Sequence, residues 1–420
     1  EYMAPGPRLV LPWLALQDRR PDAPEATQYV LDMPAGVQPA HIGDYVAPWR
    51  DQPGGGVVVN LSLRNASEMT QARRVNDLVQ RMVYGWGGEA GALSINRPWT
   101  PAPRRQVSLI PDPVLGAFAS VASRLADRRL VGRMPIGEGL ECLIFDGPAG
   151  GMLVMWDVAA PREQAKVNLF LGPSPVAVDC WGNRRDVPMV DGRHVLQLTR
   201  APIFVEGIDP ELALFRAHFK VDEPFVESVR QPHERMVTLT NPWPRTISGH
   251  LSFAEPEGWT IAPQRRFFSI APGRSIEVPI EMTFPPAETA GPKRLAARFE
   301  FTAKQKYDVL VSTPMELGLR DIDFRASVVV ERNPRTGELD AIVQQEITNV
   351  GDDDLSLYAF ANMPGFPRQE RVIARLRPGQ LNLQRFRIPG AGEAVHEKSI
   401  RVGLRETSGP AVLNKLIRPE

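Results

Sequence analysis

The side chains that most often carry enzyme chemistry are few and widely spaced in this sequence. Each of its two cysteines, Cys142 and Cys180, lies in an apolar run typical of a strand, which predicts two buried free thiols, with one disulfide between neighbouring strands as the alternative. The six histidines lack the spacing of metal ligands. The three acids from Asp352 to Asp354 are interpreted as a solvated turn rather than a calcium site. No phosphate-binding loop and no Gly-x-Ser-x-Gly elbow occurs, so we expect no metal and no cofactor.

The composition excludes several classes of partner. Lys and Arg together number 49, as do Asp and Glu, so the net charge is zero and no basic surface for nucleic acid or an anionic membrane is expected. No apolar run reaches the roughly 18 residues that a membrane span needs. The 41 prolines and 34 glycines indicate many turns and short strands.

Residues 1–132 alternate apolar strand-like runs with helical patterns, which is the rhythm of a parallel α/β unit. Strands are expected at Leu9–Leu16, Val57–Leu63 and Gly91–Asn96, and the Pro-, Gly- and Asp-rich segment Pro21–Pro53 is expected to be mostly loop. A complete eight-fold barrel needs about 250 residues. The region is therefore interpreted as the last part of a barrel, with an open sheet edge.

Two helices are expected on either side of the short strand. Ser67 can cap the first, which ends at the glycines from Gly85 onward, and the second runs from about Pro113 to Arg128. The apolar stripe of the first helix comprises Met69, Ala72, Val75, Leu78, Val79 and Met82. The charged residues that lie largely off this stripe are Arg73, Arg74, Asp77 and Arg81.

From Leu130 onward the sequence becomes all-β. Short strand candidates separated by turn signals fill residues 133–207, a spacing typical of a β-sandwich. Two further β modules are expected at 213–312 and 313–420. In both, a strand that ends in asparagine is followed later by a Pro-Gly turn, which indicates two related immunoglobulin-like units. These pairs are Asn241 with Ala271-Pro272-Gly273, and Asn349 with Arg377-Pro378-Gly379.

Five segments between Glu68 and Glu206 carry a resemblance to a known enzyme family. They are Val83-Tyr84-Gly85-Trp86-Gly87, Ala92-Leu93-Ser94-Ile95-Asn96, Leu130-Val131-Gly132-Arg133 as a helix end, Val178-Asp179-Cys180-Trp181-Gly182-Asn183 and Ala201-Pro202-Ile203-Phe204-Val205-Glu206-Gly207. In this order they resemble the end of a retaining glycoside hydrolase of the large barrel clan whose two glutamates lie on the fourth and seventh strands. Further on, Pro256-Glu257-Gly258-Trp259 followed by Ile270-Ala271-Pro272-Gly273 is similar to the immunoglobulin-like domain associated with alpha-galactosidases and other bacterial glycosidases.

The resemblance implies a mixed fold: the end of a TIM-type α/β barrel, an all-β sandwich and two immunoglobulin-like sandwiches. The implied domains are the C-terminal part of a (β/α)8 barrel at 1–132, a β-sandwich packed on the barrel at 133–207, and immunoglobulin-like domains at 213–312 and 313–420.

Catalysis by such enzymes needs two carboxylates about 5 Å apart, at the C-terminal ends of barrel strands. The acid/base strand is expected upstream of this chain, and Val57–Leu63 holds no acid. Glu1 is a candidate catalytic carboxylate, with a glutamate that merely stands at the chain start as the alternative. The resemblance implies that Trp99 stacks under the sugar beside Asn96 and Arg97. The alternatives are a tryptophan packed on the barrel rim and two polar loop residues.

The expected function is that of the C-terminal portion of a glycoside hydrolase acting on oligo- or polysaccharides, with its catalytic carboxylates largely outside this chain. Its expected partners are a carbohydrate substrate and the upstream half of its own polypeptide, and its expected location is extracellular or periplasmic. The alternative is a non-catalytic carbohydrate-binding or structural β-sandwich protein of the cell surface.

The C-terminal modules are expected to act as spacers or weak carbohydrate contacts. Trp181, Trp243 and Trp259 are expected in cores. Phe267 and Phe268 are adjacent in a strand, so they point to opposite faces and cannot form one sugar-binding platform.

Overall fold

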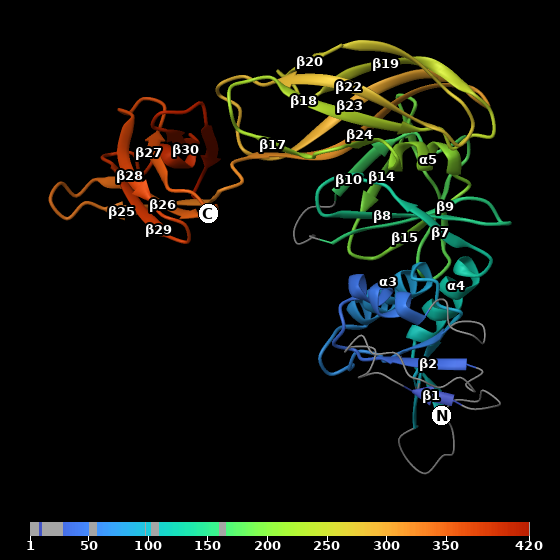
Figure 1. The fold of residues 1–420 in the computed structure, drawn as a ribbon. Coiled ribbons are helices and arrows are strands. Elements are labelled where there is room, and N and C mark those ends of the chain that lie inside the picture. Colours follow the sequence, from blue (N-terminus) through green and yellow to red (C-terminus); the bar gives the residue numbers. More distant parts are fainter. Residues whose placement is uncertain are drawn as a thin grey trace. The chain divides into compact units, whose positions relative to one another are not determined.

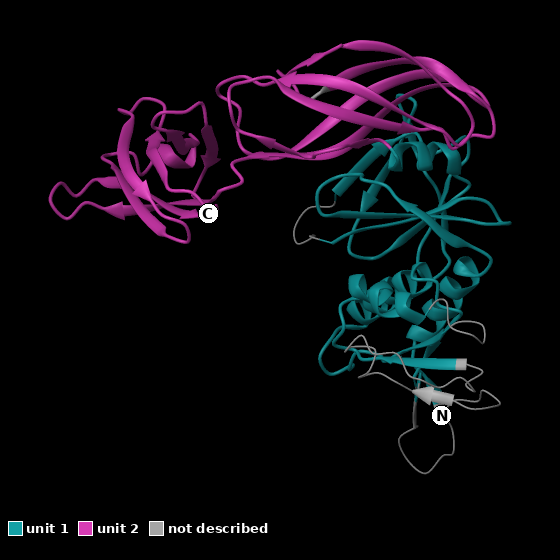
Figure 2. Ribbon diagram, in the orientation of Figure 1, with its two compact units in different colours: residues 1–218 teal, residues 219–420 magenta. Residues whose placement is uncertain are grey.

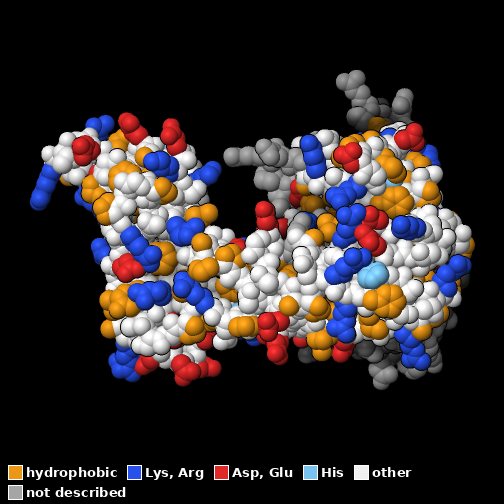
Figure 3. Space-filling model, turned by 90° about the horizontal axis from the view of Figure 1, so that it is seen from above, with side chains coloured by type: hydrophobic (Ala, Val, Ile, Leu, Met, Phe, Trp, Pro, Cys, Tyr) orange, Lys and Arg blue, Asp and Glu red, His pale blue; other side chains and the backbone are white. Residues whose placement is uncertain are grey.

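The computed structural model shows a strand-rich chain in two compact units, residues 1–218 and residues 219–420 (Figure 1, Figure 2). Basic and acidic side chains are interspersed over the face seen in Figure 3, in line with the zero net charge. No helix in the described part of the chain is long and apolar enough to cross a membrane. The structure describes residues 8–10, 28–49, 57–96, 98–101, 109–158 and 165–419.

Unit 1 begins with a parallel sheet whose strands follow the chain order β1-β2-β3-β4. Helix α3 (Gln71–Gly87) connects β3 to β4, and helix α4 (Val114–Leu125) comes after a small hairpin. The described strands form an open α/β sheet rather than a closed barrel. The sheet strands are β1 (Arg8–Val10), β2 (Gln28–Met33), β3 (Val57–Leu61) and β4 (Ala92–Ile95), and the hairpin strands are β5 (Trp99–Pro101) and β6 (Leu109–Pro111).

The segment Pro21–Pro53 was expected to be mostly loop, and this is wrong for its described residues. It contains the buried strand β2, followed by the short helices η1 (Pro39–His41), α2 (Ile42–Val46) and η2 (Ala47–Trp49). A strand covered on both faces has no polar alternation to mark it. Among its Pro- and Gly-rich neighbours, strand β2 could therefore not be recognised from the sequence.

Both helices of this layer have boundaries that differ from expectation. Thr70 caps α3 in place of Ser67, since its Oγ1 accepts a hydrogen bond from the Arg73 N–H at 3.4 Å. The segment Leu130–Arg133, expected as a helix end, belongs to strand β7 (Arg129–Arg133), which pairs with β8. The left-handed φ of 44° at Asp127 ends the helical path before it.

Two further sheets and a last helix complete unit 1. The larger sheet has the order β12-β11-β15-β9-β8-β7, and the smaller has the order β10-β14-β13. Helix α5 (Pro210–Ala217) is capped by Asp209, which accepts the Leu212 N–H at 3.0 Å. The strands are β8 (Leu140–Asp146), β9 (Met152–Asp157), β10 (Ala165–Leu169), β11 (Val176–Val178), β12 (Arg184–Asp186), β13 (Met189–Val190), β14 (Arg193–Leu198) and β15 (Ile203–Glu206).

The helices α3 and α4 lie between the parallel sheet and the six-stranded sheet, and the three layers share one hydrophobic core (Figure 1). Leu31 and Val59 enter this core from the parallel sheet, and Phe145 and Trp156 enter it from the six-stranded sheet. The Trp156 ring meets the ring of Tyr84 of α3 edge-on, with centroids 5.5 Å apart. The α/β layer therefore depends on the second sheet to cover its helices.

Unit 2 contains two pairs of antiparallel-rich sheets. The first pair has the orders β16-β18-β22-β20 and β17-β24-β23-β19-β21, and the second has β25-β26-β29 and β28-β27-β30-β31. The strands are β16 (Lys220–Val221), β17 (Phe225–Glu227), β18 (His233–Thr240), β19 (Ile247–Glu255), β20 (Thr260–Ala262), β21 (Arg265–Ile270), β22 (Ser275–Thr283), β23 (Gly291–Thr302), β24 (Lys306–Gly318), β25 (Ile322–Arg332), β26 (Leu339–Asn349), β27 (Leu355–Asn362), β28 (Gln369–Leu376), β29 (Leu381–Ile388), β30 (Ile400–Glu406) and β31 (Val412–Ile417).

The two asparagines of the repeated sequence pattern, Asn241 and Asn349, make the same hydrogen bonds. Each side-chain amide donates to the carbonyl four residues later and to the carbonyl at the end of a later strand, and each side-chain oxygen accepts the N–H two residues later. The glycine of each Pro-Gly turn donates to the backbone carbonyl of its asparagine. The repeated motif therefore builds the same strand corner in both pairs of sheets. The side-chain partners are Arg245, Ile270 and Trp243 for Asn241, and Asp353, Leu376 and Gly351 for Asn349.

The aromatic residues singled out in the sequence differ in exposure. Trp243 is fully buried, as expected, whereas Trp181 is 46% exposed, so its assignment to a core is wrong. Trp259 is partly exposed. Phe267 is 60% exposed and Phe268 is 2% exposed, which confirms that the two rings point to opposite faces.

A buried histidine is expected to make the stability of the protein depend on pH. His194 Nδ1 accepts the N–H of Leu171 at 3.1 Å, and burial lowers the pKa of His194. As the pH falls below about 6.5, the unfolded chain takes up a proton before the folded chain does, so the free energy of unfolding falls. This contribution is fully present above that pH and is lost below it.

Urea titrations between pH 5 and pH 8 test this expectation. In His194→Asn the amide oxygen can replace Nδ1 as acceptor without titrating, so the variant should lose less stability at low pH than the parent does. Equal losses in the two proteins would contradict the assigned role.

Candidate functional site

Three polar side chains line up at the carboxyl ends of adjacent parallel strands. Asp32 of β2, Asn60 of β3 and Ser94 of β4 are direct partners in the strand register. The Asn60 amide donates to Asp32 Oδ1 at 2.5 Å, and the Ser94 hydroxyl donates to Asn60 Oδ1 at 3.1 Å. We call these three residues the polar row. Ligand sites of parallel α/β sheets lie at this end of the strands.

Strand alternation places the polar row on the sheet face away from α3 and α4. The residues on either side of Asp32 in β2, and of Asn60 in β3, are buried in the helix-side core, so the two polar side chains point the other way. Asn60 is 1% exposed, whereas Asp32 and Ser94 are partly exposed. The buried amide therefore bridges a carboxylate and a hydroxyl that solvent can reach.

The buried Arg81 of α3 fixes the chain just beyond the polar row. Its guanidinium donates to the carbonyl oxygens of Ser62 and Pro34, both at 2.6 Å, and of Met33 at 3.2 Å. These carbonyls lie at or just after the ends of β2 and β3. Burial lowers the pKa of Arg81, and the Asp77 carboxylate, 3.9 Å away, opposes that shift. The sequence placed Arg81 largely off the apolar stripe, and in the structure its side chain is only 1% exposed.

Replacing Arg81 by methionine is expected to lower the free energy of unfolding by about 2–4 kcal/mol, because three backbone carbonyls each lose the hydrogen bond from the buried guanidinium. Chemical denaturation checks this value. Arg73→Met on the exposed side of the same helix is the matched control and should change stability by about 0.5 kcal/mol or less. Equal effects at the two positions would show that Arg81 does not hold these loops.

A second arginine, Arg74, ties α3 to the hairpin segment that carries Trp99. Its Nη2 donates to Asp112 Oδ2 at 2.7 Å, and the Asp112 N–H donates to the carbonyl of Pro98 at 2.8 Å. Burial alone would raise the pKa of Asp112, but hydrogen bonds from the Val114 N–H and from Arg74 outweigh this and lower it. The ionised Asp112 thus joins α3, the start of α4 and the residue before Trp99.

The structure describes two of the site residues named from the sequence. Trp99 is 47% exposed in β5, and Asn96 is exposed directly after β4. The Asn96 N–H donates to the Leu61 carbonyl at 3.3 Å, which keeps Asn96 at the carboxyl end of the sheet. Within the described ranges, no side-chain hydrogen bond joins Asn96 or Trp99 to the polar row. Glu1 and Arg97 lie outside the described residues.

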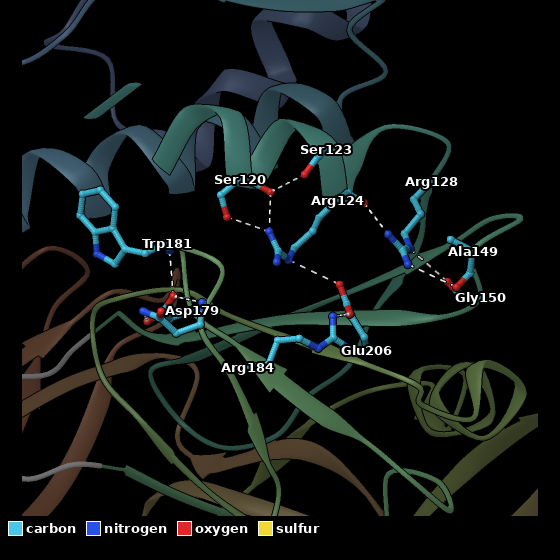
Figure 4. Close-up of polar contacts among 11 residues, drawn as sticks. Ser120, Ser123, Arg124, Arg128, Ala149, Gly150, Asp179, Trp181, Arg184 and Glu206 are labelled. Atoms are coloured by element: carbon cyan, nitrogen blue, oxygen red, sulfur yellow. Dashed lines mark hydrogen bonds and ion pairs between the residues drawn. The ribbon is translucent and has the colours of Figure 1, made fainter. Parts of the chain in front are cut away.

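A second polar cluster joins α4 to the six-stranded sheet (Figure 4). The Glu206 carboxylate of β15 lies 3.4 Å from Arg124 of α4 and 2.9 Å from Arg184 of β12. Arg128 adds to this contact by donating hydrogen bonds to the carbonyls of Ala149 and Gly150. Because the carboxylate is shared between two guanidinium groups from different elements, this cluster ties α4 to the six-stranded sheet.

The exposed Trp181 lies at the same contact between α4 and the six-stranded sheet. Asp179 Oδ1 accepts the Trp181 N–H at 2.8 Å and fixes the turn that presents the ring (Figure 4). A Cβ atom at Gly116 of α4 would lie 3.8 Å from the ring, so the ring covers the helix at that glycine. Trp181 is therefore half-covered at the rim of a core rather than inside one.

Other chemistry-bearing groups in the described residues do not form a site. No group of three or more His, Cys, Asp or Glu side chains there could hold a metal ion. Cys142 and Cys180 are buried and free, which confirms the prediction of two free thiols. Burial raises the pKa of both thiols, that of Cys180 to about 11, so neither is a thiolate nucleophile near neutral pH.

Sequence reasoning missed the polar row and Arg81. A signal for Asn60 was present, because an amide alone in the apolar run Val57–Leu61 needs a buried hydrogen-bond partner. Asp32 carried no such signal, since its strand was hidden among turn-forming residues. Arg81 stood among other charged residues of one helix, and nothing in the sequence separated it from the solvated ones.

No family model and no curated protein matches this chain. Among solved structures, a family 39 glycoside hydrolase from Bacteroides cellulosilyticus WH2 is similar with a TM-score of 0.35 and 14% identity, over 44% of this chain and 44% of that one. The chain thus spans less than half the length of that hydrolase. The YadV chaperone (TM-score 0.19, 9% identity) and the periplasmic chaperone SfaE (TM-score 0.18, 8% identity) each match 47% of this chain, and 99% and 98% of their own lengths. Scores this low do not assign a fold or a function.

Proposed function

We propose that this chain is the C-terminal portion of a glycoside hydrolase that acts on oligo- or polysaccharides. The observation that carries the proposal is the polar row at the carboxyl ends of three adjacent parallel strands, where α/β enzymes bind their substrates. The sequence resemblance described above points to the same class of reaction. Within this proposal residues 1–132 are the end of a barrel, 133–207 are its packed sandwich, and 213–312 and 313–420 are spacer domains.

The polar row suits a sugar because it offers hydrogen-bond acceptors. The Asp32 carboxylate can accept hydrogen bonds from sugar hydroxyls, and so can the Ser94 oxygen, whose own proton is donated to Asn60 Oδ1. Asn60 is buried and keeps the two groups in position. The exposed Trp99 ring offers an apolar face on which a sugar ring stacks, with Asn96 beside it.

Glycoside hydrolysis needs two carboxylates on opposite sides of the scissile bond. Asp32 is one carboxylate on the site face of the sheet, and Glu1 remains a candidate for another. We infer that the upstream half of the polypeptide supplies the acid/base and completes the site, and that the protein works outside the cytoplasm, in the extracellular space or the periplasm.

The test is turnover of a panel of aryl glycosides. The 420-residue chain alone should show no turnover, and a polypeptide extended upstream by the barrel strands that we propose should release the aryl group from at least one glycoside. Turnover by the 420-residue chain that a point change within it abolishes would contradict the division of the site. An extended polypeptide with intact fold and no turnover of any glycoside would favour a non-catalytic carbohydrate-binding or structural protein.

A further inference from the structure

A hollow of about 530 Å³ lies beside the turn that links β19 to β20 in unit 2 (Figure 1 labels both strands). Pockets that bind small ligands commonly have volumes of about 300–1,000 Å³. One wall is apolar and includes Pro256 and Trp259, and the polar side chains along it are those of Glu257, Thr260 and Gln264. Trp259 was expected in a core, but it is partly exposed and is one of the residues that line this hollow.

The Trp259 ring is held in a fixed position. Its indole Nε1 donates to Glu288 Oε2 at 3.0 Å, and its ring packs against Phe284 with centroids 5.1 Å apart. The Trp259 N–H donates to the Pro256 carbonyl at 3.2 Å, which closes the turn. A ligand that meets this ring does not have to immobilise it first, so little conformational entropy is lost on binding.

Glu288 anchors the indole as an ionised group. Its carboxylate also accepts hydrogen bonds from Lys293 and from the Thr289 N–H. Burial alone would raise the pKa of Glu288, but the hydrogen bonds from Lys293 and Trp259 outweigh it and lower the pKa. The anchor therefore persists through the neutral and mildly acidic range.

The charge of the side chains that line the hollow limits which ligands can bind there. Among the described side chains that line it, Glu257 is the one that carries a charge, and it is exposed. A carboxylate there repels sulfate, phosphate and uronic acid groups. The wall otherwise combines a fixed indole with hydroxyl, amide and carboxylate groups that bond to hydroxyls.

From this geometry we propose that the hollow beside Trp259 binds one uncharged pyranose unit of a glycan, with its C–H face stacked on the indole. The proposal is independent of the polar row and of any hydrolysis there. It assigns the first pair of sheets of unit 2 a weak carbohydrate contact in addition to a spacer role.

Saturation-transfer NMR on the 420-residue chain tests the proposal, with methyl β-glucopyranoside, methyl α-galactopyranoside, glucuronate and a proline-rich peptide as separate probes. Every protein in this experiment also carries Trp99→Ala, so that sugar binding beside the polar row does not contribute to the signal. We expect transfer to the ring C–H protons of at least one neutral pyranoside. Trp259→Ala should reduce that transfer at least about tenfold, as the loss of roughly 1.4 kcal/mol or more of binding implies, whereas Trp181→Ala should leave it unchanged.

A second variant is needed because Trp259→Ala could lose binding simply by failing to fold. Glu257→Lys changes an exposed rim residue and should make glucuronate transfer detectable while the neutral sugar still binds. The proposal is overturned if neutral pyranosides show no transfer, if transfer survives in Trp259→Ala, if Glu257→Lys leaves glucuronate silent, or if only the peptide binds.

Discussion

Replacing Trp156 by alanine is expected to lower the free energy of unfolding of unit 1 by about 3–5 kcal/mol, the usual cost of removing a fully buried indole. Trp156 is 2% exposed and lies in the core that the parallel sheet, the two helices and the six-stranded sheet share. Its ring contacts Tyr84 of α3 edge-on. The change would leave a cavity where the helices meet the second sheet, so both layers should loosen together.

Urea denaturation of the parent and the variant measures this effect, with the fluorescence and the far-ultraviolet circular dichroism followed in parallel. Trp181→Ala is the matched control. It also removes an indole from unit 1, but one that is 46% exposed, and it should lower stability by only about 1–2 kcal/mol. Equal losses in the two variants would show that the shared core does not hold unit 1 together.

Cutting the chain after residue 132 is expected to produce a protein that aggregates. The sequence already suggested one reason, because part of a parallel sheet exposes unpaired strand edges. The structure adds a second, since the cut removes the sheet that covers the buried faces of α3 and α4. Residues 1–218 form a compact unit and serve as the matched control.

Size-exclusion chromatography and thermal unfolding of the two fragments decide the question. The fragment 1–132 should elute as aggregates and show no cooperative transition, and the fragment 1–218 should form fewer aggregates. A monodisperse fragment 1–132 that melts cooperatively would contradict this expectation.

Amphipathic elements were the easiest to predict from the sequence. The stripe of α3 buries Val75, Leu78, Val79 and Met82, and the pattern of adjacent Phe267 and Phe268 gave their opposite exposures. The repeated asparagine and Pro-Gly pattern in unit 2 was visible because both copies build the same hydrogen-bonded corner. In these cases the pattern is visible in the sequence, although the Asn241–Ile270 and Asn349–Leu376 bonds join residues that are 29 and 27 positions apart.

The polar row could not be predicted because its geometry depends on pairing between distant segments. Asp32 and Asn60 are 28 residues apart, and Asn60 and Ser94 are 34 residues apart. Their contact exists only once three strands are in register. Trp181 was misjudged, and the role of Arg81 was missed, for a related reason: their surroundings are decided by chain segments that pack on them from elsewhere.

The burial of Trp243 also rules out one experiment that the sequence alone would suggest. Trp243→Ala is a natural test of sugar binding if only the Pro-flanked sequence is considered. Trp243 is fully buried and its N–H bonds to Asn241, so this change should unfold the surrounding sheets instead of probing a surface. Trp99 is 47% exposed and Trp259 is partly exposed, so a change at either residue permits such a test.

The most direct measurement of the proposed function is kcat/KM for an aryl glycoside in a polypeptide extended upstream of this chain, compared between Asp32→Ala and Asp44→Ala. Asp32 belongs to the polar row, whereas Asp44 is exposed on α2 in the same layer. A hydrogen bond to a charged group contributes about 1.5–3 kcal/mol, so Asp32→Ala should lower kcat/KM about 10- to 100-fold, and Asp44→Ala should leave it unchanged. Equal kcat/KM values in the two variants would contradict the assignment of the polar row to the sugar site.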